Sequence, residues 1–318
     1  MVSSRKMGIK KFLINYNTYL ILLLLFVVSS LLSEHFLTVM NIRNIGLQQV
    51  APILVALGML FVILTGGIDL SVGSVMAFGS SFVTVFMAAT STHFIPSMLI
   101  AGVLGMMFGL ITGMLVAYTG MQGFVASLAM MTIARGAAFM LTGGQPIRVE
   151  PGTLDLLVSR NHMFPGLIMV GVVILIFVFV QRYTVYGRMV IAIGSNNQAV
   201  ELAGIRVKRY TASVYALSGF LSAIAGTFIA ARAAMGSANI GVGQELSAIA
   251  ACVIGGASLA GGRGFVLRAV AGAFVIALIG NILNLMAVPA YPQQIIQGVI
   301  ILIAVLLQIY TSKTEKSV

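Results

Sequence analysis

Long runs of apolar residues recur along the chain and are separated by short polar segments. Examples are Leu22–Leu32, Val50–Leu64, Leu167–Val180 and Gly298–Ile309. A helix needs roughly 20 mostly apolar residues to cross a bilayer, whereas a membrane-spanning strand alternates apolar and polar residues over about ten positions. Because the runs are continuous, the pattern predicts an all-α integral membrane protein.

About ten transmembrane helices fit this pattern. The predicted spans are residues 17–34, 45–65, 71–90, 95–118, 123–142, 164–181, 210–231, 246–260, 268–287 and 292–310. The basic residues before the first apolar run imitate a secretory signal, but a convincing small-x-small cleavage site is missing. We therefore interpret residues 17–34 as the first transmembrane helix.

The amino-acid composition supports a membrane protein and excludes two kinds of cysteine chemistry. Only 8% of the 318 residues are charged, against roughly 25% in a typical soluble domain, and the mean hydropathy is +1.08. The 35 glycines suit close helix packing in lipid. The single cysteine, Cys252, excludes an intramolecular disulfide and a cysteine metal cluster.

The basic residues predict the orientation of the chain. With both termini inside, thirteen Lys and Arg fall on the cytoplasmic side, and four fall outside: Arg43, Arg148, Arg160 and Arg232. The reverse orientation would invert this distribution, which the positive-inside rule disfavours. The even number of spans therefore places both termini in the cytoplasm, with the largest external loop at residues 143–163 and the largest cytoplasmic loop at 182–209.

A weak internal similarity divides the single transmembrane domain, residues 1–318, into two halves at about 41–165 and 205–310. The pattern G-x-D-L-S at residues 67–71 recurs as G-x-E-L-S at 243–247, an offset of 176 residues between Asp69 and Glu245. Five predicted spans lie within that offset, so the halves would have opposite orientations. Inverted repeats of this kind are typical of transporters, although chance similarity between Gly-rich segments remains the alternative.

The cytoplasmic loop 182–209 contains a candidate docking helix. Asn196 or Asn197 can cap a short helix that runs to Ala203, and Gly204 provides the stop before the chain re-enters a span. A short capped helix between long spans suits docking into a groove on another protein. The alternative is a basic loop that only sets the topology.

Three ordered motifs resemble one family. The run A-I-G-S-N-x-x-A-V-x-x-x-G-I at residues 192–205 is similar to the cytoplasmic coupling segment of ATP-binding-cassette (ABC) importer permeases of the ribose, xylose, arabinose, galactose and autoinducer-2 branch. G-G-I-D-L-S-V-G at 66–73 and E-L-S-A-I-A-A at 245–251, followed by Gly-rich residues 255–264, also resemble family signatures. The chain departs from that pattern at Ser247, where the family usually has Asp, and at Phe265 and Arg268.

The resemblance implies a permease subunit in the bacterial inner membrane with several partners. These are cytoplasmic ABC ATPase subunits, an extracytoplasmic solute-binding protein, and a second permease chain that is identical or a close paralogue. No cofactor is expected in this chain, because none of its Gly clusters reads G-x-x-x-x-G-K-[ST]. The residues that match the coupling segment are Asn196, Asn197, Ala199, Val200, Glu201, Gly204 and Ile205.

Polar residues within or beside the predicted spans are candidates for a translocation path: Gln48, Asp69, Ser71, Arg135, Glu245, Asn281, Asn284, Gln293, Gln294 and Gln297. Arg135 could contact solute or form an ion pair with Asp69 or Glu245. Asp69 could belong to a bent segment that lines a cavity, or it could cap a helix. The amides suit a polyhydroxylated solute, and hydrogen bonding between helices is their alternative role.

The sequence gives little support for an enzyme. No metal-binding motif, paired carboxylates within one span or Ser-His arrangement is present. We therefore expect the permease subunit of an ABC importer, which moves a small sugar (pentose or hexose) or sugar-like solute into the cytoplasm by alternating access. The alternative function is a self-contained facilitator or channel that is not coupled to ATP.

Overall fold

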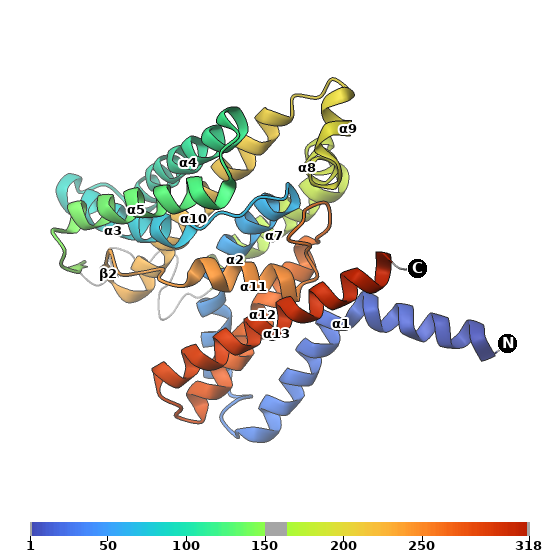
Figure 1. The fold of residues 1–318 in the computed structure, drawn as a ribbon. Helices are drawn as coiled ribbons and strands as arrows, with labels where there is room; N and C mark the ends of the chain where they lie inside the picture. Colours follow the sequence, from blue (N-terminus) through green and yellow to red (C-terminus); the bar gives the residue numbers. More distant parts are fainter. Residues whose placement is uncertain (1, 150–163, 317–318) are drawn as a thin grey trace.

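The computed structural model describes residues 2–149 and 164–316, and these residues form a helical bundle (Figure 1). Residues 150–163, which hold most of the predicted external loop, lie outside the described part of the chain. The elements are α1 (Val2–Leu32), α2 (Val39–Leu64), α3 (Val72–Thr90), α4 (Phe94–Thr119), α5 (Gly123–Thr142), β1 (Ile147–Arg148), α7 (Phe164–Tyr183), α8 (Val185–Ser195), α9 (Asn197–Leu202), α10 (Val207–Ala233), β2 (Met235–Gly236), α11 (Gln244–Ile254), α12 (Val266–Leu285) and α13 (Ala290–Lys316).

Seven helices in the described residues are long and apolar enough to cross a membrane: α2, α3, α4, α5, α7, α10 and α12. They coincide with seven of the ten predicted spans. The predicted span 246–260 differs, because α11 has only 11 residues and is about 16 Å long at about 1.5 Å per residue. The helix ends before Gly255, and Gly256 turns the chain with a φ of +82°. The segment thus covers about half of a hydrocarbon core that is about 30 Å thick.

Two helices form the centre of the bundle. In both α2 and α10, 83% of the most apolar window is buried, compared with 17% in α7. Figure 1 shows α2 between the group formed by α3, α4, α5 and α10 and the group formed by α11, α12 and α13. Since apolar side chains that stay exposed in a membrane protein face lipid, α7 belongs to the periphery and α2 and α10 to the core.

The contact between α4 and α10 depends on glycines spaced at helical intervals. Gly105, Gly109 and Gly113 lie on one face of α4, and the backbone of α10 approaches that face closely. A Cβ atom at Gly113 would lie 2.7 Å from the carbonyl oxygen of Ala212, which is shorter than a van der Waals contact. This small-xxx-small stripe lets the two backbones meet, as is common between helices in lipid.

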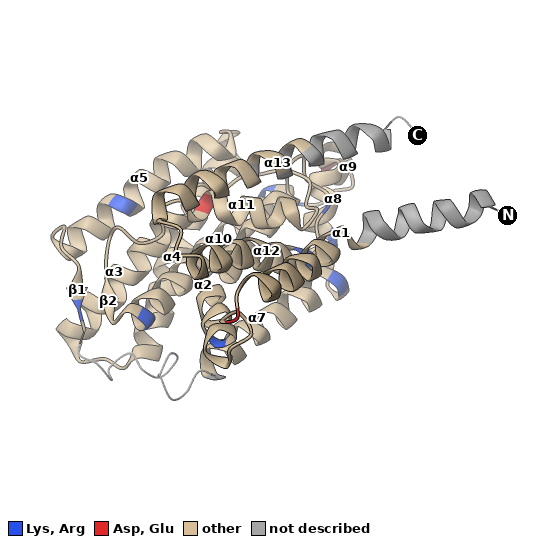
Figure 2. Ribbon diagram, turned by 90° about the horizontal axis from the view of Figure 1, so that it is seen from below, with Lys and Arg blue, Asp and Glu red and all other residues tan. Residues whose placement is uncertain are grey.

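The bundle has two distinct ends. At one end, β1 pairs with β2 in an antiparallel ladder, with Ile147 opposite Gly236 and Arg148 opposite Met235. At the other end lie α8 and α9, and Figures 1 and 2 both show α1 and α13 leading toward that side. Most of the ribbon in Figure 2 is neither basic nor acidic, and several basic residues lie around α8 and α9.

Candidate functional site

The helix α9 has the boundaries that its sequence predicts. Asn196 is the N-cap, and its Oδ1 atom accepts a hydrogen bond from the Ala199 N–H at 3.0 Å. At the other end, Gly204 adopts a φ of +78°, and its N–H donates to the Glu201 carbonyl at 2.9 Å. The cap satisfies a free backbone donor, and the left-handed glycine stops the helix. Local sequence signals therefore define this six-residue helix.

One face of α9 is anchored and the other is exposed. Val200 is buried against Ile193 of α8 and Val207 of α10, and Ile205 packs against the same small cluster. On the outer side, Leu202 is 89% exposed. Leu202 therefore presents an apolar side chain outward from a helix whose position is fixed by Val200. Leu202 is not among the residues predicted from sequence, although its position two residues after the buried Val200 is a usable signal.

The end of α8 contacts the end of α2. The Gly262 N–H donates to the Leu64 carbonyl at 3.0 Å, and Gly194 lies so close to both residues that a Cβ atom there would be 2.5 Å from the Gly262 nitrogen. Movement of α8 would therefore act directly on α2, which is at the centre of the bundle, and α9, which contacts α8, would act through it.

A polar cavity lies between α2, α11, α12 and α13, and its volume is about 210 Å³. Its lining includes five of the ten candidate path residues, which come from three different helices: Gln48, Asn281, Asn284, Gln293 and Gln297. Pockets for drug-sized ligands occupy about 300–1,000 Å³, so this cavity suits a smaller solute. Carboxamides both donate and accept hydrogen bonds, as recognition of several hydroxyl groups requires.

The amides in this cavity fall into two groups. Asn281 exchanges two hydrogen bonds with Asn41, at 3.1 and 2.8 Å, and Gln293 donates to Asn284 at 2.9 Å. Gln48 and Gln297, in contrast, make no side-chain hydrogen bond to any other residue in the described part of the chain. The first group ties helices together, and the second leaves its donors and acceptors available to a solute.

Asp69 and Ser71 lie elsewhere, in a closed polar cluster. The Asp69 carboxylate is completely buried and accepts hydrogen bonds from the Ser71 N–H at 3.0 Å, the Ser71 hydroxyl at 2.6 Å and the Ser218 hydroxyl at 2.9 Å. The helix α3 starts at Val72 with Ser71 as its N-cap, so Asp69 is neither the N-cap nor part of the lining of the cavity. The structure places it as a clamp between the α2–α3 connection and α10.

Arg135 contacts backbone carbonyls and does not line the polar cavity. Its Nη1 atom donates to the carbonyls of Ala238 and Ile240, at 2.5 and 2.7 Å. Neither Asp69 nor Glu245 accepts these hydrogen bonds, although Glu245 attracts the guanidinium electrostatically. Arg135 thus connects α5 to the segment between β2 and α11. This contact differs from both roles considered from the sequence, an ion pair with Asp69 or Glu245 and a contact with solute.

Three polar residues outside the candidate set also line the cavity: Gln49 of α2, and Gln244 and Ser247 of α11. Of the six amide candidates, Gln294 alone does not line it. Ser247 stands where the resembling family usually has Asp, and that departure is the signal that could have identified it. The lining of this cavity is therefore neutral at Ser247, where that family usually has a charge.

Comparison with known proteins identifies the family of this chain. A family model described as "Branched-chain amino acid transport system / permease component" matches residues 41–305. The chain belongs to this permease family. It is accordingly a multi-pass transport protein of the bacterial inner membrane and not an enzyme.

Curated relatives match the permease over nearly its whole length. It is 38% identical to the ribose import permease protein RbsC of Haemophilus influenzae over 310 residues, which covers 95% of each chain. It is 36% identical to the Escherichia coli K12 protein of the same name, covering 96% of this chain and 97% of the relative. The L-arabinose ABC transporter permease protein AraH of Azospirillum brasilense is 34% identical, with 94% and 88% covered. No solved structure matches.

Proposed function

We propose that this permease is the membrane subunit of an ABC importer that carries a pentose, a hexose or a similar small solute into the cytoplasm. ATPase subunits in trans would supply the energy, a solute-binding protein would deliver the solute, and a second permease chain would complete the transporter. The relatives named for ribose and arabinose transport support the sugar class. The observation that carries the coupling to ATP is the capped and stopped helix α9, which holds Leu202 outward.

The mechanism we infer is alternating access driven through α9. Closure of the ATPases would push on the exposed face of α9, while Val200 fixes the helix to α8 and α10. The contact between Gly194 and Leu64 would pass the displacement to α2. Because α2 also lines the amide cavity, this chain of contacts connects the docking face with the proposed solute path.

The arrangement of the helices supports ten membrane-associated helices in two inverted halves. The segments related by the 176-residue offset meet, since Gly73 at the start of α3 lies against Gly241 and Glu245 at the start of α11. The two most buried helices, α2 and α10, hold equivalent places in the two halves. We infer cytoplasmic termini, because α1 and α13 lead toward the side of α8 and α9, where the basic loop lies.

Reconstitution with the ATPase and the solute-binding protein tests this proposal. Vesicles that contain all components should take up labelled ribose, arabinose or a related sugar only when ATP is present. Leu202→Ser and Gly204→Trp should each abolish ATP-driven uptake, because the first removes the apolar contact and the second forces a bulky residue into a left-handed turn. Both variants should still bind the solute-binding protein, since that partner docks on the opposite membrane face.

The facilitator alternative predicts a different result in the same experiment. Vesicles that hold the permease alone would then leak sugar without ATP, and Gly204→Trp would leave the flux unchanged. Full ATP-coupled uptake by Gly204→Trp would contradict the assigned role of α9 even if the importer function holds.

A further inference from the structure

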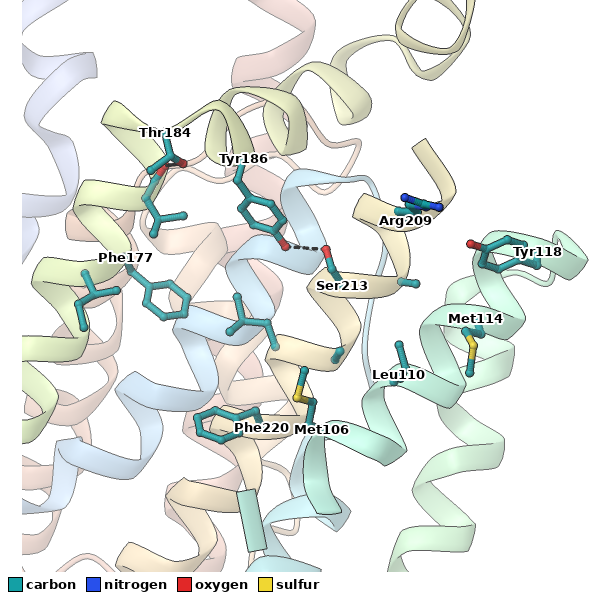
Figure 3. A pocket seen from close by; sticks show the side chains of 15 residues that line it. Met106, Leu110, Met114, Tyr118, Phe177, Thr184, Tyr186, Arg209, Ser213 and Phe220 are labelled. Carbon is teal, nitrogen blue, oxygen red and sulfur yellow. Dashed lines mark hydrogen bonds between the residues drawn. The ribbon is translucent and has the colours of Figure 1, made fainter. Parts of the chain in front are cut away.

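A large apolar groove lies on the periphery of the permease, away from the amide cavity. Its volume is about 860 Å³, and α4, α7 and α10 form its walls (Figure 3). The helices α4 and α7 are both mostly unburied, with 33% and 17% of their most apolar windows inside the protein. The groove therefore opens toward the hydrocarbon of the bilayer and not toward the centre of the bundle.

The groove is apolar at one end and polar at the other. Figure 3 shows Met106 and Phe220 at the apolar end, and Thr184, Tyr186 and Arg209 toward the polar end. The Tyr186 hydroxyl and the Ser213 hydroxyl lie 2.8 Å apart and form a hydrogen bond. Burial raises the pKa of Tyr186, so the phenol stays neutral and able to donate a hydrogen bond.

A second, basic pocket of about 500 Å³ continues from the polar end. It shares Tyr186, Arg209 and Ser213 with the groove and adds Arg206. Lys208 lies nearby, with its ammonium 5.6 Å from the ring centroid of Tyr118, another groove residue. The lining of the two pockets contains no acidic residue, so the site carries a net positive charge at its polar end alone.

The length of the groove matches one leaflet of a bilayer. On α4 the lining extends from Met106 to Tyr118, twelve residue steps that span about 18 Å at about 1.5 Å per residue. Half of the hydrocarbon thickness is about 15 Å. An acyl chain that follows the groove from its apolar end would therefore bring its glycerol and phosphate to the level of Arg209.

We propose that this groove and the adjoining basic pocket form a selective site for an anionic phospholipid. One acyl chain lies along α4, α7 and α10, and the phosphate contacts the guanidinium groups of Arg206 and Arg209. Basic pockets between membrane helices recognise anionic headgroups through such contacts. Arg206 is the N-cap residue of α10 and follows the end of α9 by only a few positions, so the lipid would bind beside the coupling helix.

Bromine quenching can test this site because the chain contains no tryptophan. Met114→Trp places a single reporter in the groove, at a position that is 42% exposed. Ile111→Trp is the matched control, since Ile111 is on the same helix, is 43% exposed and does not line the groove. Each variant is placed in phosphatidylcholine vesicles that contain increasing fractions of phosphatidylglycerol with brominated acyl chains. A second series uses brominated phosphatidylcholine.

The proposal predicts that Met114→Trp is quenched at a mole fraction of brominated phosphatidylglycerol on the order of tenfold lower than that of brominated phosphatidylcholine. Ile111→Trp should respond equally to both lipids. Adding Arg206→Gln and Arg209→Gln should remove the preference at Met114→Trp, whereas Arg188→Gln, which changes an exposed arginine outside the site, should leave it intact. Equal quenching of Met114→Trp by the two lipids would overturn the proposal.

Two more outcomes separate the lipid from a protein partner and from misfolding. If the arginine substitutions release the ATPase while the lipid preference persists, the arginines dock a protein and the lipid site is wrong. If Met114→Trp does not fold, phospholipid analysis of the detergent-washed wild-type chain replaces it. Retention of about one phosphatidylglycerol per chain, lost in the Arg206→Gln/Arg209→Gln variant, would support the site, and equal retention by both chains would contradict it.

Discussion

Two regions of this permease place polar residues among apolar helices, and they differ in how those residues are hydrogen-bonded. The Asp69 carboxylate is completely buried, and Ser71 and Ser218 donate all of its hydrogen bonds within the described residues. In the cavity between α2, α11, α12 and α13, Gln48 and Gln297 keep their amides uncommitted and face open volume. A polar residue among apolar helices is therefore evidence of a solute path only when its hydrogen-bonding capacity is not already used within the protein.

The strongest test of this difference is Asp69→Leu. The substitution leaves the Ser71 N–H and the hydroxyls of Ser71 and Ser218 without their buried acceptor. Each unsatisfied buried group costs about 1–3 kcal/mol, so we expect a loss of about 3 kcal/mol or more in the free energy of unfolding. Thermal unfolding in detergent and the yield of folded protein would measure it.

Asp69→Asn is the control for that prediction. Its amide can still accept from Ser71 through Oδ1 and can donate to the Ser218 hydroxyl through Nδ2. The loss of stability should accordingly be smaller than for leucine. If Asp69→Leu unfolds at the wild-type temperature but transports no sugar, Asp69 belongs to the path and the proposed clamp is wrong.

A smaller effect is expected for Ser218→Ala, which removes one of the three donors to Asp69. A hydrogen bond to a charged group contributes about 1.5–3 kcal/mol, and the two donors from Ser71 remain, so a loss near 1.5 kcal/mol is expected. In a double-mutant cycle with Asp69→Leu, the two losses should fail to add, because each substitution removes the same hydrogen bond. Simple additivity would mean that the contact contributes nothing.

In the cavity, substitution of an amide that is not hydrogen-bonded within the described part of the chain should affect transport without affecting stability, which is the reverse of the result expected at Asp69. Gln297→Leu should leave thermal stability unchanged and weaken sugar uptake about tenfold, which corresponds to about 1.4 kcal/mol of lost solute binding. Asn281→Leu should lower stability by about 1 kcal/mol, because Asn41 loses both of its reciprocal hydrogen bonds. Uptake kinetics in vesicles and thermal unfolding of the same preparations measure both quantities.

The interpretation of the cavity would be contradicted by a reversal of this pattern. A Gln297→Leu variant with wild-type uptake and reduced stability would show that Gln297 joins helices. Gln294→Leu is a suitable control, since Gln294 is on the same helix but does not line the cavity, and it should leave uptake unchanged.

Hydropathy predicts much of the fold because its signal is local. Each of the seven helices long enough to span contains a continuous window of high mean hydropathy. The limits of α9 follow from Asn196 and Gly204, which act on their immediate neighbours. The predicted span 246–260 was too long because the Gly255–Gly256 pair ends α11 early. Continuous hydropathy thus identifies an apolar segment without giving the length of its helix.

The candidate site could be predicted only in part, since its contacts join distant segments. Asn281 and Asn284 could be paired from their spacing on one helix, but the approach of Gln48 depends on tertiary packing. The partner of Asp69 in α10, Ser218, is 149 residues away. Sequence alone therefore selected both regions as polar and had no means to separate the closed cluster from the open cavity.

The smallest predicted effect concerns α9, where one asparagine is hydrogen-bonded within the protein and its neighbour does not cap the helix. Asn196→Ala removes the side chain that accepts a hydrogen bond from the Ala199 N–H. An N-cap of this kind contributes about 1 kcal/mol to the stability of its helix. Asn197→Ala changes the neighbouring asparagine, which is exposed and does not cap the helix. A loss of about 1 kcal/mol corresponds to about a fivefold change in affinity. We therefore expect Asn196→Ala to weaken retention of the ATPase about fivefold in co-purification. Asn197→Ala should leave retention unchanged. Equal effects of the two substitutions would mean that the ATPase contacts the asparagines themselves, so that α9 acts through its side chains rather than through its fixed helical shape.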